Sequence, residues 1–451
     1  MKITARKIQS YFTKFAVVAL ALAVSACGGS SSTTAESGTP AATVIGGGTN
    51  VALTIAGKVV LLAGTGTALH SADLATGSGA GFNVVKGITT DGTNIYALDS
   101  SGSSIRKVVI STGVTTTIAG GSGAALLSGY SDGYGTGGWF SEVNGIISVH
   151  NATGAATIGL VNGVPTKGAL FNAPMGITYA SNKLFVADTG NNAIRQISLS
   201  GTGYPVTTLA GSGVDYFLNN VGGSTMSGAS LYSGATVVGL WSGAQLGAGG
   251  FTGGQLGGSG GGMAGYADGT ASGAAFNNPT GLTTDGTNIY VADQNNNVIR
   301  KVVIASGVVT TLAGGGNTGA ISGSGATGFR DGNGSGQTLF NLPSDITFDG
   351  TNLYVLDQNG TVIRKVTTAG VVTTVGNLLG VSGIAAKNIT TDGTYVYITD
   401  PATGKNVVRM TITTGYVAIP YSGVVSTSLA GITTDGTNIF IASNFAVFEM
   451  N

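Results

Sequence analysis

The sequence predicts an all-β fold in which one short unit of strands repeats around an axis. A phrase recurs with few changes: GITTDGTNIYALD begins at Gly87, GLTTDGTNIYVAD at Gly281 and GITTDGTNIFIAS at Gly431. Such self-similarity is typical of repeat architectures. The chain also has 79 glycines, and a glycine inside an α-helix costs roughly 1 kcal/mol relative to alanine. Many short strands joined by turns fit this composition.

The repeat has a period of 43 residues where it is most regular. This distance separates Ile346 from Ile389, and Ile389 from Ile432. A unit of this length with four antiparallel strands has the size of one β-propeller blade. The equivalent positions earlier in the chain are Ile88, Ile177 and Leu282.

The unit that runs from Ala274 to Gly315 shows the expected strands most clearly. They are four β-rich segments bounded by turn residues, namely Gly281–Thr284, Ile289–Ala292, Val298–Ile304 and Val308–Ala313. Asp285-Gly286 is expected to form the first turn, because glycine tolerates positive φ.

Six blades are predicted, with the two ends of the chain sharing the last one. The unit that begins at Ile432 ends at Asn451 after only three strands. The segment KVVLLAG (Lys58–Gly64) is similar to the fourth-strand phrase VVTTLAG (Val308–Gly314), so it is expected to complete that blade.

Seven blades are the alternative. The distance from Ile88 to Ile177 is 89 residues, and Gly138–Ser148 faintly repeats the approach to a first strand. Only 31 residues separate Ile146 from Ile177, too few for a blade and its linker. A hairpin insertion is therefore the preferred interpretation.

The unit resembles the NHL repeat family. The matching residues are Asn278-Pro279-x-Gly281, Ile289-Tyr-Val-Ala-Asp293, Asn296-Asn297-x-Ile299-Arg300 and the preceding Gly265-Tyr-Ala-Asp-Gly269. The resemblance covers most of residues 58–450 and implies a propeller. Some six-bladed relatives in this superfamily are lactonases or amidating lyases that hold a metal ion near the axis.

The N-terminus predicts export and a lipid anchor. Basic residues precede a short apolar run, Phe15–Val24, as in a secretory signal. The following Ser25-Ala26-Cys27 resembles a bacterial lipobox, with Cys27 as the lipidated residue; an ordinary signal peptide with a core cysteine is the alternative. Gly28 favours the outer membrane, with display at the cell surface or in the periplasm. We therefore predict a signal peptide at 1–26, a flexible tether at 27–45 and the propeller at 46–451.

Composition excludes several kinds of site. The formal net charge is +0 and only 8% of residues are charged, which argues against a nucleic-acid partner. Cys27 is the single cysteine, so disulfides and cysteine-ligated metals are excluded.

Two long insertions, at about 121–168 and 212–262, interrupt the repeat. They carry aromatic residues that are expected to bind a partner, because aromatic side chains offer large contact areas. The alternative is that they pin the insertions onto the propeller. These candidates are Trp139, Tyr216, Phe217, Tyr232, Trp241 and Phe251.

Acidic residues recur at fixed places in the unit. An aspartate ends the second strand in five units and is interpreted as an Asx turn, with calcium ligation as the alternative. These are Asp99, Asp188, Asp293, Asp357 and Asp400. A second set is expected to form the first turn: Asp91, Asp285, Asp349, Asp392 and Asp435. Arginines on the third strand are expected to pair with an aspartate of the same or an adjacent blade, at Arg106, Arg195, Arg300, Arg364 and Arg409.

Catalytic signals are weak, so the chain is predicted not to be an enzyme and to need no cofactor. Its two histidines, His70 and His150, lack zinc-ligand spacing, and the one G-x-S-x-G match, Gly257–Gly261, lies in a glycine run. The predicted role is binding or scaffolding of a protein or glycan through the insertion-bearing face. A metal-dependent hydrolase or lyase and a self-assembling surface protein are the alternatives.

Overall fold

The computed structural model describes the chain between Val59 and Met450, with gaps. The described ranges are 59–67, 74–101, 103–120, 169–201, 203–211, 264–315, 326–378, 386–400, 406–421 and 429–450, together with the backbone of short strands between 133 and 165. The chain divides into two units, Met1–Ala41 and Ala42–Asn451, and every described residue belongs to the second.

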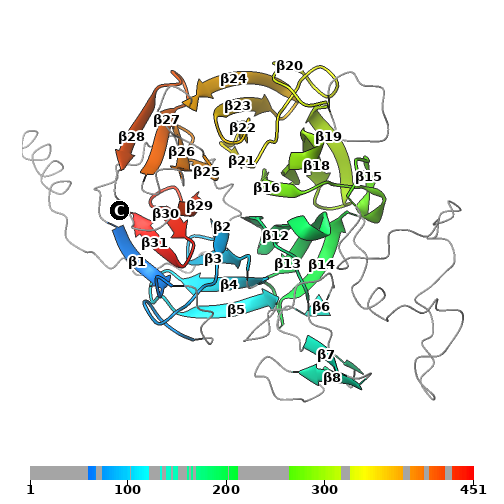
Figure 1. Ribbon diagram of the computed structural model, residues 1–451, viewed down its shortest axis with the longest axis vertical. Helices are drawn as coiled ribbons and strands as arrows, with labels where there is room; N and C mark the ends of the chain where they lie inside the picture. The colour runs from blue at the N-terminus through cyan, green and yellow to red at the C-terminus, as the bar shows by residue number, and fades with distance from the viewer. Residues whose placement is uncertain are drawn as a thin grey trace, which may run out of the picture. The chain divides into compact units, whose positions relative to one another are not determined.

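Six antiparallel sheets follow one another around a ring (Figure 1). Blade 1 is β2 (Val85–Thr90), β3 (Asn94–Asp99), β4 (Ser104–Val109) and β5 (Thr115–Gly120); blade 2 is β11 (Gly176–Ala180), β12 (Lys183–Asp188), β13 (Ala193–Ser198) and β14 (Pro205–Ala210). Blade 3 is β16 (Pro279–Thr284), β17 (Asn288–Asp293), β18 (Val298–Val303) and β19 (Val308–Gly314); blade 4 is β21 (Asp345–Phe348), β22 (Asn352–Asp357), β23 (Val362–Thr367) and β24 (Val371–Asn377). Blade 5 is β25 (Ile389–Thr391), β26 (Tyr395–Asp400), β27 (Asn406–Thr411) and β28 (Val417–Tyr421); blade 6 is β29 (Leu429–Thr434), β30 (Ile439–Ser443), β31 (Ala446–Met450) and β1 (Val59–Gly64).

Short elements accompany the blades. Three two-residue strands add to the outer edges of blades 2, 3 and 4, namely β6 (Gly133–Tyr134), β15 (Gly269–Thr270) and β20 (Gly332–Asn333). Two separate pairs are β7 (Trp139–Val143) with β8 (Ile146–His150), and β9 (Leu160–Val161) with β10 (Val164–Pro165). The 3-10 turns are η1 (Thr189–Asn191), η2 (Ala271–Gly273) and η3 (Gln294–Asn296). Within the described ranges, no helix has the length and apolarity needed to cross a bilayer.

The six-blade prediction is confirmed, and so is the shared last blade. β1 pairs antiparallel with β31, with Val59 opposite Met450 and Gly64 opposite Ala446. Strand β29 of the same blade contacts β2 of blade 1, which closes the ring. The seven-blade alternative is wrong, because β7 and β8 form an isolated hairpin rather than a blade.

The core lies between neighbouring blades. Each of the six blade junctions has its own cluster of buried apolar side chains. At the junction of blades 1 and 2, for example, Leu98 and Ile105 pack with Phe171 and Val186. A blade is covered on both faces, so its second strand is buried from Ile289 to Asp293 without alternation.

The first turn depends on its aspartate in five of the six blades, as predicted; blade 2 has Ser181-Asn182 in this turn. In blade 3, Asp285 Oδ1 accepts hydrogen bonds from the N–H of Thr287 at 2.8 Å and of Asn288 at 2.6 Å. Tyr290 donates its hydroxyl to Asp285 Oδ2 at 2.8 Å. The same pair of backbone bonds forms at Asp91, Asp349, Asp392 and Asp435.

Candidate axial site

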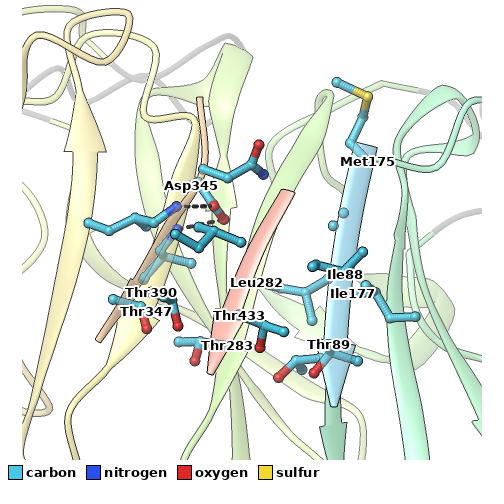
Figure 2. Close-up of a pocket in the computed structure, with 17 residues that line it drawn as sticks. Ile88, Thr89, Met175, Ile177, Leu282, Thr283, Asp345, Thr347, Thr390 and Thr433 are labelled. Atoms are coloured by element: carbon cyan, nitrogen blue, oxygen red, sulfur yellow. Dashed lines mark hydrogen bonds between the residues drawn. The ribbon is translucent and has the colours of Figure 1, made fainter. Parts of the chain in front are cut away.

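The inner strands of all six blades line a cavity on the axis (Figure 2). Its volume is about 70 Å³, room for roughly five water molecules at 10–15 Å³ each. Three successive positions of the inner strand build its wall, although Gly281 and Gly431 are not among the residues that line it. The first position holds Gly87, Gly176, Gly281, Asp345, Asn388 and Gly431; the second holds Ile88, Ile177, Leu282, Ile346, Ile389 and Ile432; the third holds Thr89, Thr178, Thr283, Thr347, Thr390 and Thr433.

Glycine is required at the first position of blades 2 and 3, because the neighbouring inner strand approaches it closely there. A Cβ on Gly176 would overlap the carbonyl oxygen of Thr280 in the next blade. A Cβ on Gly281 would likewise overlap the backbone and carboxylate of Asp345. The repeat therefore keeps this level free of side chains in four blades, and blades 4 and 5 depart from the pattern.

Asp345 is the carboxylate that this departure places on the axis. Its Oδ1 accepts the N–H of Ile346 at 2.9 Å, and its Oδ2 accepts the N–H of Ile389 in blade 5, also at 2.9 Å. Protein encloses Asp345, although part of its side chain remains exposed to the cavity. Burial raises the pKa of Asp345 to about 7, although hydrogen bonds from Ile389, Ile346 and the Asn388 side chain oppose the rise.

A ring of threonine hydroxyls lies two positions further along the inner strands. Thr89 is 4% exposed, and Thr347, Thr390 and Thr433 are each 7% exposed. Alternate residues of a strand point to the same face. Each threonine therefore points to the same face as the first-position residue of its own strand. None of the six hydroxyls is hydrogen-bonded to another described residue. The wall thus offers one carboxylate, one amide and six hydroxyls.

The predicted Asp set lies elsewhere, buried inside individual blades. Asp188, Asp293 and Asp357 bind Arg195, Arg300 and Arg364 of the same blade, at 2.8, 2.9 and 2.9 Å. All six side chains are fully buried. The prediction of pairing within a blade is confirmed for these three, and the pairs are buried rather than exposed.

These aspartates tie the turn to the incoming linker instead of capping only their own turn. Asp188 Oδ1 accepts the N–H of Asn172 at 2.8 Å, and Asp293 Oδ1 accepts that of Asn277 at 2.8 Å. In blade 1, Asp99 accepts the N–H groups of both Asn83 and Val84. The Asx-turn interpretation therefore misses a longer-range contact, which only the fold creates.

Burial raises the pKa of these aspartates by more than the neighbouring arginine lowers it. It raises the pKa of Asp293 to about 6, although Arg300, Asn296 and Asn277 oppose it, and it raises the pKa of Asp188 in the same way. The five aspartates belong to five blades, and within the described ranges no three acidic, histidine or cysteine side chains cluster as metal ligands do.

The other predicted site residues cannot be placed with respect to this cavity. Trp139 belongs to β7, of which only the backbone is described. The remaining aromatic candidates and the lipidation site lie outside the described residues, namely Tyr216, Phe217, Tyr232, Trp241, Phe251 and Cys27. Their roles stay predictions.

Sequence reasoning missed Asp345 and Asn388. The signal was present in the repeat, because both occupy a position where Gly87, Gly176 and Gly431 stand in the aligned units. A repeat pattern identifies the residues that recur, whereas the axial carboxylate is a departure from that pattern.

Comparison with known proteins finds similar solved structures but no family. No protein-family model matches the chain, and no curated protein matches it. Similar solved structures include a nidogen/laminin complex, at 16% identity over 77% of this chain and 84% of that chain, with a TM-score of 0.42. A streptogramin B lyase matches at 12% identity over 87% and 97%, with a TM-score of 0.43. A gluconolactonase from Xanthomonas campestris matches at 10% identity over 88% and 96%, with a TM-score of 0.44.

These likenesses correct one prediction. The expectation that the chain is not an enzyme is contradicted, because the similar structures include lyases and gluconolactonases, at 8–14% identity. These structures have TM-scores of 0.42–0.45, so the likeness assigns no activity to this chain. The β-propeller part of the NHL resemblance is confirmed.

Proposed function

We propose that the chain is an exported NHL-type propeller that binds a protein or glycan partner through the face bearing its two long insertions. We further propose that a lipid on Cys27 anchors it to the outer membrane, after removal of residues 1–26 and with residues 27–45 as a tether. The anchor would keep the propeller at the membrane while leaving its binding face accessible.

The attachment points of the two insertions support this proposal. One insertion joins β5 to β11 and the other joins β14 to β16, so both flank blade 2. Both enter the next blade on the face of the second-to-third turns, where Asn172 and Asn277 are bonded to Asp188 and Asp293. In blades 2, 3 and 4 the recurring aspartate and arginine of that face are buried in ion pairs, which favours recognition by the segments that do not repeat.

Replacing Ser212–Gly262 by a short glycine-serine linker tests the proposal. The unfolding temperature should stay unchanged, whereas capture of a partner from the surface fraction of the producing organism should be lost. Deleting residues 316–325, a linker of the same type before blade 4, is the matched control and should leave capture intact. A variant without Ser212–Gly262 that captured the same partner as the parent would contradict the proposal.

A metal-dependent hydrolase or lyase is the second candidate, favoured by one observation. Asp345 and Asn388 place a carboxylate and an amide side by side on the propeller axis. The cavity of about 70 Å³ holds no organic substrate, so a substrate would have to bind at its mouth. Hydrolysis of a panel of lactones with added Ca²⁺ or Zn²⁺ tests this candidate, and activity retained by Asp345→Asn would count against it.

A further inference from the structure

We propose that the axial cavity binds a single hydrated alkali-metal cation beside the carboxylate of Asp345. The inference is independent of the proposed partner binding, but it competes with the metal-dependent candidate, because both place an ion at Asp345. It rests on the charge of Asp345, on the volume of the cavity and on threonine hydroxyls that have no partner among the described residues.

The charge of Asp345 has no counter-ion among the described residues that line the cavity. Asp188, Asp293 and Asp357 each pair with a buried arginine of their own blade. Among the described residues that line the axial cavity, Asp345 is the one titratable group, and no lysine, arginine or histidine is present. Buried charges in proteins are paired or coordinate metal ions. Asp345 therefore either carries a proton or faces a cation in the cavity.

The cavity has the space and the oxygen atoms for a hydrated ion. Asp345 and Thr347 are two residues apart on β21, a separation of roughly 6.6 Å along a strand. One cation cannot contact both side chains directly, but a cation at the carboxylate with water ligands can reach the hydroxyls. The threonine hydroxyls have no hydrogen-bond partner among the described residues. The volume of about 70 Å³ accommodates the ion with a few water molecules.

The number of charges favours a monovalent ion. The wall offers one carboxylate, and its other groups are neutral amide, hydroxyl and backbone oxygens. Sodium or potassium would bring the cavity to neutrality, whereas a divalent ion would leave an unbalanced positive charge in a site without further carboxylates. Tight calcium sites, by contrast, gather several carboxylate ligands.

Protons should compete with the cation. Because burial raises the pKa of Asp345 to about 7, the carboxylate is mostly protonated at about pH 5 and mostly ionised at about pH 8. A cation that needs the ionised form should therefore bind at the higher pH only. This dependence separates a site at Asp345 from a general effect of ionic strength.

The test compares the purified full chain in NaCl, KCl and N-methyl-D-glucamine chloride at equal chloride concentration. At about pH 8 the unfolding temperature should be about 1–3 °C higher with Na⁺ or K⁺, and the rise should saturate with concentration. At about pH 5 the salts should be equivalent. The ²³Na relaxation rate should show a bound fraction at the higher pH that K⁺ displaces.

Two variants localise the effect. Asp345→Gly restores the residue that four other blades carry at this position, so it suits the fold, and it should abolish the cation-dependent shift. Asp331→Asn removes a half-exposed carboxylate of the blade 4 linker and should retain that shift. If Asp345→Gly fails to fold, Thr390→Val serves instead and should weaken the ²³Na signal.

Three results would overturn the proposal. Equal unfolding temperatures in all three salts at about pH 8 would mean that a proton alone occupies Asp345. A shift retained by Asp345→Gly would place the ion elsewhere. A saturable shift with Ca²⁺ alone, and none with Na⁺ or K⁺, would show that the charge argument for a monovalent ion is wrong.

Discussion

Arg300 is the residue whose removal should most clearly reveal how a blade is held together. Its Nη1 donates to Asp293 Oδ2 at 2.9 Å and to the Ala275 carbonyl at 3.0 Å. Its Nη2 donates to the Ala267 carbonyl at 2.6 Å and to Asp268 Oδ1 at 2.9 Å. One guanidinium thus joins the third strand, the second-to-third turn and the incoming linker.

The substitution Arg300→Met keeps the length and apolar stem of the side chain while removing its charge. Breaking a buried ion pair costs about 3–5 kcal/mol, because the partner is left as an unpaired buried charge. The guanidinium also lies 5.2 Å from the Tyr266 ring centre and 5.1 Å from that of Phe276. Such contacts are worth about 2 kcal/mol in a desolvated site, and methionine replaces them in part. We expect the free energy of unfolding to fall by about 3–5 kcal/mol at about pH 8.

The loss should be smaller at low pH. Burial already raises the pKa of Asp293 to about 6 from an ordinary 3.8, and Arg300 opposes that rise. A folded pKa above the unfolded value means that ionising Asp293 costs stability as pH rises through about 4 to 6. Without Arg300 the pKa rises further, so at about pH 5 Asp293 is neutral and the unpaired charge disappears.

Urea unfolding at about pH 5 and about pH 8 measures both effects. Arg409→Met is the control. Arg409 on β27 lies opposite Tyr397, which is the place of Lys301 rather than of Arg300 in blade 3, so the expected alignment of Arg409 with the buried arginines is wrong. Its side chain is only half-buried and lies 4.3 Å from the Tyr395 ring centre. This substitution should cost about 1 kcal/mol or less. A loss below about 1 kcal/mol for Arg300→Met, or an equal loss at both pH values, would refute the argument that an unpaired buried carboxylate is responsible.

Three further outcomes are expected. Deleting Val59–Ala63 removes most of β1 from blade 6 and should lower the unfolding temperature followed by circular dichroism; an unchanged melt would mean that β1 is not needed for closure. Gly281→Ala should cost about 1–3 kcal/mol in urea unfolding, since its Cβ would overlap Asp345, whereas Gly273→Ala, with nothing within 4 Å, should change stability by less than about 0.5 kcal/mol. Without alkali cations, Asp345→Asn should be more stable than the parent at about pH 8, and the difference should shrink towards about pH 5, because the raised pKa of Asp345 makes its ionisation costly; a difference independent of pH would contradict this.

Much of the fold could be read from the residues alone. Three local patterns predicted six blades and their closure by Lys58–Gly64: the 43-residue period, the Asp-Gly turns and the three-stranded last unit. Each pattern could be read from neighbouring residues, because it reflects the strands and turns of a single blade. The strands expected at Gly281–Thr284 and Ile289–Ala292 lie within β16 and β17. Periodicity is a reliable guide to such elements because every copy faces the same packing demands.

The candidate site depended on the tertiary structure. Asp188 and Asn172 are 16 residues apart, and their hydrogen bond exists only because the linker returns to the turn of its own blade. Asp345 is one aspartate among many in the sequence, and it becomes distinctive only when six inner strands converge and place it on the axis. Local sequence therefore determined the blade and the number of blades, whereas ring closure decided which carboxylates are paired inside a blade and which one faces the central cavity.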